Sequence, residues 1–244
     1  MLTTNINFKN FHLKKISKNI KEDLKRLLKE KNMILESLSS SYQNSYSKKT
    51  ISKIKNYKNI RVIGIGGSIL GTEAIYDFLK PKVKKKFEFI NNLESRTNFS
   101  FKKKKLNLVV SKSGNTLETI TNSNIFIKAG DKNIFITENK ESYLFLLAKK
   151  LKAEIVHHNN FIGGRFSVLS EVGMLPAELM GLDSKKFKQM NNLIKNKKFI
   201  NSLLINVSNT LFFLKKKKFN SIILNYDEGS KNIFKWYQQL IAES

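Results

Sequence analysis

Residues 62–71 read Val62-Ile63-Gly64-Ile65-Gly66-Gly67-Ser68-Ile69-Leu70-Gly71, and residues 108–119 read Leu108-Val109-Val110-Ser111-Lys112-Ser113-Gly114-Asn115-Thr116-Leu117-Glu118-Thr119. In each stretch a short apolar run passes into small and hydroxyl residues and then into a helical pattern. A strand that ends at a helix N-terminus presents free backbone N–H groups and the positive end of the helix dipole, which favour anions. Glycines allow close approach, and Ser and Thr add donors. The two loops therefore predict a cleft for a phosphorylated ligand.

Alternating strands and helices surround these loops. We expect strands at Ile60–Ile65, Phe87–Ile90, Leu106–Val110, Asn133–Thr137 and Glu154–Val156, and helices at Ile69–Leu79, Thr116–Ala129 and Ser142–Leu151. Consecutive apolar, β-branched positions are typical of strands buried on both faces of a parallel sheet. The pattern predicts an α/β domain over residues 58–158, with a mostly parallel sheet flanked by helices.

The flanking regions predict two further parts. Residues 1–57 are expected to be a helical segment, with helices from Ile20 to about Ser39 and over Ile51–Tyr57. Residues 159–244 are expected to open a second domain, with helices at Val168–Leu179 and Lys231–Ser244 and a strand at Ser221–Leu224. The stretch Lys185–Leu214 is also expected to be helical, either continuous or broken near Lys195–Lys198. Because one strand cannot make a sheet, we expect this second domain to be incomplete.

The composition excludes several function classes. The chain has no Cys, so disulfides and thiolate chemistry are excluded. The net charge of +26 suggests a nucleic-acid partner at first sight, but only four of the 45 basic residues are Arg, the residue favoured in base readout. We interpret the charge as the compositional bias of an AT-rich genome and expect no nucleic-acid partner.

The sequence also predicts the cellular compartment of the protein. The N-terminal residues lack a basic-then-apolar signal pattern, and no apolar run reaches the ~18 residues that a membrane span needs. We therefore expect a cytoplasmic protein without a membrane partner.

Each loop has a purely structural alternative. The glycines at 64, 66, 67 and 71 fit a dinucleotide fingerprint poorly, and a tight strand-to-helix turn explains them as well. In the second loop Ser111, Ser113 and Thr116, with Lys112 between them, can wrap a phosphate monoester. The alternative is ordinary capping of the helix by Ser113 or Thr116.

Outside the loops, two charged residues stand out. Arg165 follows two glycines in a Lys-dominated chain, which suggests a need for its planar fork, although a structural ion pair is the alternative. Glu243 follows Trp236 by seven residues, and from spacing alone we favour a fraying helix end over a site. His12, His157 and His158 lack metal-ligand spacing with acidic partners, so we expect no metal.

Four blocks, in order, resemble the glucose-6-phosphate isomerase (phosphoglucose isomerase) family: residues 64–71, 111–119, 163–170 and 236–244. The first two alone resemble any sugar-isomerase (SIS) domain, a Rossmann-like sugar-phosphate fold. The last two, Gly163-Gly164-Arg165-Phe166-Ser167-Val168-Leu169-Ser170 and Trp236-Tyr237-Gln238-Gln239-Leu240-Ile241-Ala242-Glu243-Ser244, are more specific to the isomerase.

The resemblance implies interconversion of glucose 6-phosphate and fructose 6-phosphate without a metal or cofactor. It implies that Arg165 stabilises the enediolate and that Glu243 moves the proton. It also implies a homodimer for the complete protein and a substrate-binding set of Gly67, Ser68, Ser111, Lys112, Ser113 and Thr116.

Two departures from the family qualify these expectations. Asn115 stands where the family commonly has Thr. The family also continues past the Glu-Ser pair and supplies a histidine and a lysine there, whereas this sequence stops at Ser244. We therefore expect a truncated product with weak or absent activity. The alternative function is a sugar-phosphate-binding SIS module without catalysis.

Overall fold

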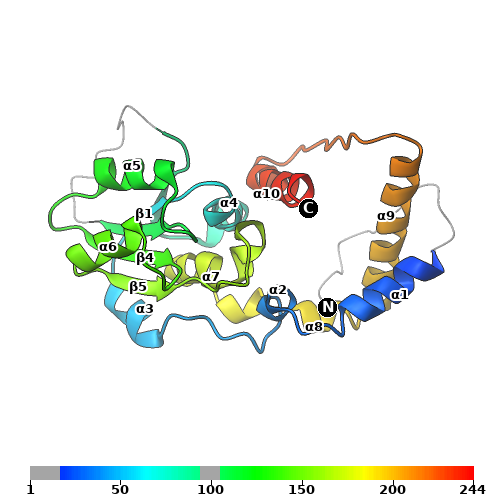
Figure 1. Cartoon of the computed structure of the whole chain (residues 1–244), viewed down its shortest axis with the longest axis horizontal. Coiled ribbons are helices and arrows are strands. Elements are labelled where there is room, and N and C mark those ends of the chain that lie inside the picture. Colours follow the sequence, from blue (N-terminus) through cyan, green and yellow to red (C-terminus); the bar gives the residue numbers. More distant parts are fainter. Residues whose placement is uncertain (1–16, 94–104) are drawn as a thin grey trace. The chain divides into compact units, whose positions relative to one another are not determined.

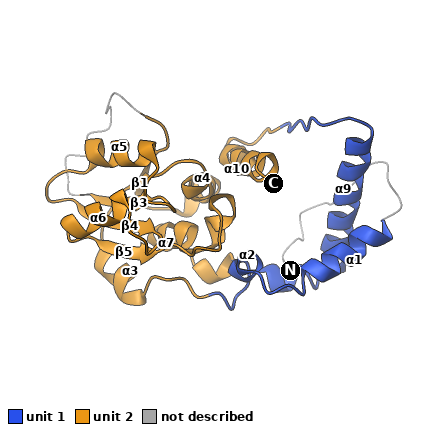
Figure 2. Cartoon of the chain, viewed as in Figure 1, with its two compact units in different colours: residues 1–42, 188–224 blue, residues 43–187, 225–244 orange. Residues whose placement is uncertain are grey.

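The structure is a computed structural model that describes residues 17–93 and 105–244 (Figure 1). His12 and Arg96 lie outside the described residues. The described chain divides into two compact units (Figure 2). Unit 1 takes residues up to 42 and residues 188–224, and unit 2 takes residues 43–187 and 225–244.

Unit 2 is built on a five-stranded sheet in the order β2-β1-β3-β4-β5, in which every neighbouring pair is parallel. This confirms the predicted α/β fold. All five residues of β3 are buried, as expected for a central strand covered on both faces. The strands are β1 (Asn59–Ile63), β2 (Lys86–Ile90), β3 (Leu106–Val110), β4 (Lys132–Thr137) and β5 (Glu154–His157).

Helices cover both faces of this sheet (Figure 1). Because successive strand residues point to opposite faces, Val62 and Leu108 join one apolar cluster while Ile63 and Val109 join the other. The first cluster includes residues of α4 and α7, and the second includes residues of α5 and α6. These helices are α4 (Leu70–Phe78), α5 (Leu117–Phe126), α6 (Tyr143–Lys150) and α7 (Glu171–Leu179), and α3 (Lys48–Ile54) also belongs to unit 2.

Short 3₁₀ turns connect these elements. They are η1 (Gly66–Ser68), η2 (Lys80–Lys82), η3 (Gly164–Leu169), η4 (Ser184–Lys186) and η5 (Glu228–Ser230). η3 occupies most of residues 163–170, including the predicted start of a helix at Val168. The helix that follows begins only at Glu171, because Ser170 caps it by accepting a hydrogen bond from the Val172 N–H.

The last helix, α10 (Lys231–Ala242), packs on α4 of unit 2. Ile233 and Trp236 of α10 line an apolar pocket of about 200 Å³ together with Ala74 and Phe78 of α4. The compact units therefore do not follow boundaries at 57/58 and 158/159, since unit 2 crosses both of them. The division into a helical segment, a first SIS domain and a second SIS domain stays a prediction about the domains of the whole protein.

Unit 1 consists of helices and extended chain in its described part. It holds α1 (Lys18–Leu27), α2 (Met33–Ser37), α8 (Met190–Leu193) and α9 (Lys197–Lys215). The single helix expected from Ile20 to Ser39 is two helices, because the Asn32 side chain accepts a hydrogen bond from the Ile34 N–H and starts a new one. The stretch 185–214 is divided among η4, α8 and α9, and the gap between α8 and α9 agrees with the break allowed near Lys195–Lys198.

The strand expected at Ser221–Leu224 was wrong for this structure. These residues form neither helix nor strand, and Ile222 and Leu224 are 84% and 74% exposed. A strand needs a neighbour to accept its backbone hydrogen bonds, and the five strands of the described chain all belong to the sheet of unit 2. Within the described ranges, no helix is long and apolar enough to cross a membrane.

Candidate functional site

The two glycine- and hydroxyl-containing loops follow neighbouring strands of the sheet. The first follows β1 and the second follows β3, and these strands pair in parallel, so both loops leave the same sheet edge. At Gly64, directly after β1, a Cβ atom would lie 3.0 Å from the carbonyl oxygen of Val110, the last residue of β3. The predicted meeting of the two loops is therefore present in the fold.

The hydroxyls of the second loop bond within the loop. The side-chain oxygens of Ser111 and Thr116 share a hydrogen bond of 2.9 Å, and the Gly114 N–H donates to the Ser111 hydroxyl at 3.2 Å. Ser113 is exposed and its hydroxyl accepts from the Asn115 N–H at 3.2 Å. Thr116 precedes α5 but makes no side-chain capping bond. Simple capping by Thr116 or Ser113 is thus not what these hydroxyls do.

The second loop is fixed to the start of α6. The Asn115 side chain accepts a hydrogen bond from the Tyr143 N–H at 2.9 Å. Gly114 has a φ of +67°, and a Cβ there would collide with the Ser142 side chain. A residue other than glycine would be strained at Gly114 on both counts. The first turn of α5, the predicted anion site, is therefore held at the sheet edge.

Lys112 points to protein groups in this structure. Its ammonium group donates to the Asn160 carbonyl at 2.7 Å and lies 3.7 Å from the Glu138 carboxylate. Its side chain is 31% exposed. The expected role of Lys112 in substrate binding stays a prediction, and the contacts indicate that it also ties the loop to the chain after β5.

The first loop lies directly against η3. A Cβ at Gly67 would lie 2.5 Å from the backbone nitrogen of Arg165, closer than such atoms approach. The Ser167 hydroxyl donates to the carbonyls of Gly67, at 3.2 Å, and Gly164, at 2.7 Å. Ser68 ends η1 and is half-buried. The glycine at position 67 is explained by this close backbone contact.

Arg165 contacts three residues of the chain's last helix and its end. Its Nη1 lies 3.8 Å from Glu243 Oε2, and its Nε donates to the Ser244 hydroxyl at 3.3 Å. Its backbone carbonyl accepts a hydrogen bond from the Trp236 indole at 2.9 Å. The guanidinium carbon also lies 4.5 Å from the centre of the Phe166 ring. The expected pair of Arg165 and Glu243 is brought together across 78 residues of sequence.

Glu243 lies at the end of α10 and is held there by contacts with Arg165 and Gln239. Gln239 Nε2 donates to Glu243 Oε1 at 2.9 Å, and a Cβ at Gly66 would lie 3.1 Å from the same nitrogen. Spacing alone favoured a fraying helix end, and that expectation misses both contacts. The side chain is 48% exposed, so the apolar surroundings in which a carboxylate becomes a stronger base are only partly present.

Sequence reasoning missed two residues near this site. Gln239 lies one helical turn before Glu243, a spacing that places side chains side by side and was a readable signal. Glu73 on α4 is the other: it is 94% buried, and its Oε1 accepts from Asn91 Nδ2 at 2.9 Å. Burial raises the pKa of Glu73 to about 7, a shift that Lys235 and the Asn91 hydrogen bond reduce and Asp77 increases.

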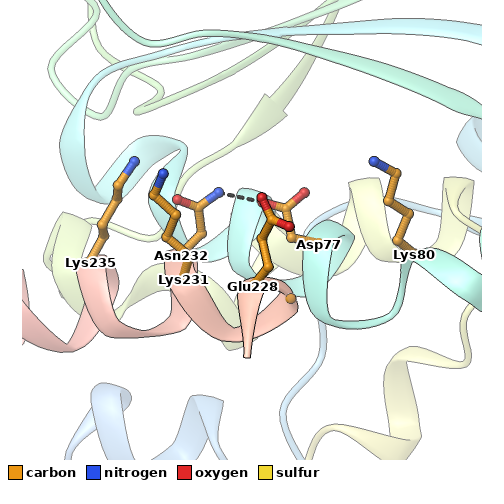
Figure 3. Close-up of a pocket in the computed structure, with 7 residues that line it drawn as sticks. Asp77, Lys80, Glu228, Lys231, Asn232 and Lys235 are labelled. Carbon is orange, nitrogen blue, oxygen red and sulfur yellow. Dashed lines mark hydrogen bonds between the residues drawn. The ribbon is translucent and has the colours of Figure 1, made fainter. Parts of the chain in front are cut away.

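A polar pocket of about 490 Å³ lies beside the start of α10 (Figure 3). Lys80, Lys231 and Lys235 line it together with Asp77 and Glu228, and the Asn232 side chain donates to Asp77. None of the sequence-predicted site residues lines this pocket. Its mixed charge gives no preference for an anion or a cation.

The described histidines take no part in the site. His158 is buried 3.8 Å from Glu171, and burial lowers its pKa. His157 accepts a hydrogen bond from the Asn139 N–H. Among the residues described, no group of three His, Asp or Glu side chains is arranged to hold a metal ion.

The comparison with protein families decides the ancestry of this site. The family model for phosphoglucose isomerase matches residues 7–244. The chain belongs to the phosphoglucose isomerase family. The glucose-6-phosphate isomerase of Methanocaldococcus jannaschii is 34% identical over 209 residues, which is 78% of this chain and 51% of that protein. That of Acholeplasma laidlawii is also 34% identical, with the same coverage.

Solved structures support the fold. A protein of Thermus thermophilus, titled hypothetical protein TT0462, superimposes with a TM-score of 0.68 at 24% identity over 93% of this chain and 60% of that one. As a phosphoglucose isomerase family member, the chain spans about half the length of the curated relatives it matches. The contact between Arg165 and Glu243 lies inside the matched region.

Proposed function

We propose that the site at Arg165 and Glu243 performs the isomerisation of glucose 6-phosphate to fructose 6-phosphate. The observation that carries this proposal is the 3.8 Å approach of the two side chains, one from η3 and one from the end of α10. Isomerisation needs a base beside a carbonyl and a fixed positive charge near the oxygen that becomes anionic. A carboxylate and a guanidinium in contact supply both.

The sugar phosphate is proposed to lie across the two loops. The first turn of α5 and the hydroxyls of Ser111, Ser113 and Thr116 are suited to the phosphate group. Ser68 and Gly67 on the first loop, with Lys112 on the second, complete the proposed substrate-binding set. The close packing of Gly67 against the backbone of Arg165 supports this arrangement, because it links the phosphate loop to the reacting end.

The proposed reaction moves one proton between neighbouring carbons. Glu243 takes the proton from C2 of the open aldose, and the electron pair shifts toward the C1 oxygen to form an enediolate. Arg165 stabilises the charge on that oxygen. Glu243 then returns a proton to C1. The hydroxyl proton on the C2 oxygen passes to the C1 oxygen, so that the C2 oxygen becomes the ketose carbonyl and the C1 oxygen becomes a hydroxyl. The Glu243 carboxylate is therefore regenerated at the end of the reaction, and the substrate undergoes no net oxidation or reduction.

A second candidate is a sugar-phosphate-binding module without catalysis. The half-exposed side chain of Glu243 favours it, since a catalytic carboxylate works best where water is excluded. The phosphate loops would be unchanged in such a module. We further propose that the protein is cytoplasmic, as the sequence patterns indicate, and that the complete protein is a homodimer, as the resemblance implies.

Turnover of glucose 6-phosphate by the purified chain separates these functions. If the isomerase proposal holds, the chain turns over glucose 6-phosphate at a low rate that falls at least ~100-fold further in Glu243→Gln, because the amide cannot accept the proton. Glu228 is an exposed carboxylate just before the start of α10. The variant Glu228→Gln is therefore the matched control and should leave turnover unchanged. No turnover with a melting temperature raised by fructose 6-phosphate would support the binding module. If the chain showed neither turnover nor a raised melting temperature, both candidate functions would be contradicted.

A further inference from the structure

Trp236 links the helix that carries Glu243 to the backbone of Arg165. Its indole Nε1 donates to the Arg165 carbonyl oxygen at 2.9 Å. The ring is half-buried and lines an apolar pocket with Gly71 and Ala74 of α4 and Val168 of η3. A phenyl ring fills much of the same apolar space, so packing alone does not require an indole at this position.

The first loop also packs against η3 around Arg165. The Gly67 backbone lies against Gly164 and Arg165, and the Ser167 hydroxyl bonds the Gly67 and Gly164 carbonyls. These contacts fix where η3 lies on the first loop. The Trp236 hydrogen bond instead comes from α10, and therefore sets η3 relative to the helix whose end holds Glu243.

Trp236 and Glu243 lie on one side of α10. Seven residues are close to two turns of helix, about 10 Å along the axis, so both side chains face η3. One reaches the carbonyl of Arg165 and the other its guanidinium. A shift of η3 along α10 would change both contacts together, because the indole hydrogen bond and the 3.8 Å approach of Arg165 to Glu243 join the same two elements.

We propose that Trp236 is a positioning residue that aims the Arg165 guanidinium at the sugar oxygen on C1. This inference rests on the proposed function. The indole acts through Arg165, and none of the residues proposed to hold the phosphate group lines its apolar pocket. Its loss should weaken the binding of ligands that carry negative charge at C1. It should leave the binding of the phosphate group unchanged.

Two ligands that differ only at C1 test this inference. 6-Phosphogluconate has a carboxylate at C1 that imitates the charge of the enediolate, and glucitol 6-phosphate has an uncharged hydroxymethyl group there. Titration calorimetry of the full chain gives the ratio of their affinities. We expect Trp236→Phe to reduce the preference for 6-phosphogluconate about three- to tenfold, the effect of losing one hydrogen bond. Glucitol 6-phosphate should bind as before.

Two further variants make the result decisive. Arg165→Gln should remove the preference altogether, and Tyr237→Phe, on the more exposed side of the same helix, should keep it. An unchanged preference in Trp236→Phe would overturn the inference, and so would an equal loss for both ligands, which is the mark of a merely structural residue. A wild-type chain that binds neither ligand would instead contradict the proposed function, and the inference would fall with it.

Discussion

At the scale of single residues, Arg61 is a charged side chain held inside the sheet. Its Nε lies 2.7 Å from Glu88 Oε2, its Nη1 donates to the Phe126 carbonyl, and both charged side chains are at most 6% exposed. Removing one partner would leave an uncompensated buried charge. We expect Glu88→Ala to lower the free energy of unfolding by about 3–5 kcal/mol, measured by urea denaturation.

The double variant Arg61→Met/Glu88→Leu is the control for this ion pair. It removes both charges and keeps apolar volume, and should recover most of the lost stability. A loss below ~1 kcal/mol in the single variant would contradict the assignment of a buried, coupled pair.

Glu73 makes a pH-dependent contribution to stability. Burial raises its pKa to about 7 in the folded chain, against 4.5 as the ordinary value. The folded state therefore binds the proton more tightly than the unfolded chain does. The contribution of Glu73 to the free energy of unfolding is fully present below about pH 4.5 and is lost as the pH rises through 7. Relative to Glu73→Gln, we expect the wild type to lose on the order of 2–3 kcal/mol between pH 4 and 8 in denaturant titrations.

The neighbours of Glu73 define the control. Lys235 and Asp77 act on its pKa in opposite directions, so Lys235→Met should steepen the pH dependence. Parallel stability curves for the wild type and Glu73→Gln across this pH range would contradict the raised pKa.

At the scale of elements, the packing of η1 against η3 joins the two loops of the candidate site. A Cβ at Gly67 would meet the backbone of Gly164 and Arg165, whereas one at Gly163 would meet only the Phe166 ring at 3.7 Å. We expect Gly67→Ala to cost about 1–3 kcal/mol of stability and to weaken fructose 6-phosphate binding, because η3 must move. Gly163→Ala is the matched control with neither effect. Equal behaviour of the two variants in thermal melts would refute the contact.

The extended segment that follows α9 is an apolar surface without a paired strand. Phe219, Ile222 and Leu224 are each at least 70% exposed, and exposed apolar segments of strand length promote self-association. We expect Ile222→Lys/Leu224→Lys to shift the chain toward the monomer in sedimentation velocity. The matched variant Leu117→Lys, an isolated exposed leucine on α5, should not. Unchanged association of the double variant would contradict this role of the segment.

The sequence predicts the sheet well because its signals are local. Strands such as Leu106–Val110 are apolar almost throughout and are bounded by turn residues, and the structure places them where the pattern does. The packing of α10 on α4 has no local signal, since it depends on which apolar faces meet. The strand expected at Ser221–Leu224 fails for the same reason: a pattern specifies a strand but cannot supply its neighbour.

The candidate site also has a part that the sequence predicts and a part that it does not. The strand-to-helix loops are readable from their residues, whereas the meeting of Arg165 with Glu243 was expected only through the resemblance. The indole bond from Trp236 and the amide bond from Gln239 belong to no motif. Side chains that position a reactive group are chosen by the geometry of the fold, and a sequence does not show that geometry.

At the scale of the whole molecule, unit 2 contains every residue of the proposed site. The sheet, both loops, η3 and α10 all belong to it, although α10 is separated from the rest of the unit's sequence by residues 188–224 of unit 1. The family match extends over both units. The proposed chemistry therefore lies within unit 2, where we propose that the end of α10 places a base beside Arg165 and that this base moves a proton on a sugar phosphate.

Exchange of substrate hydrogen with solvent tests this claim most directly. Fructose 6-phosphate is incubated with the chain in D₂O, and deuterium at C1 is followed by proton NMR, which detects the proton transfer even when net turnover is slow. We predict deuterium uptake at C1 that Glu243→Gln abolishes and Glu228→Gln leaves intact. Uptake that persists in Glu243→Gln, or no uptake by a chain that binds the sugar phosphate, would contradict the assignment of Glu243 as the base.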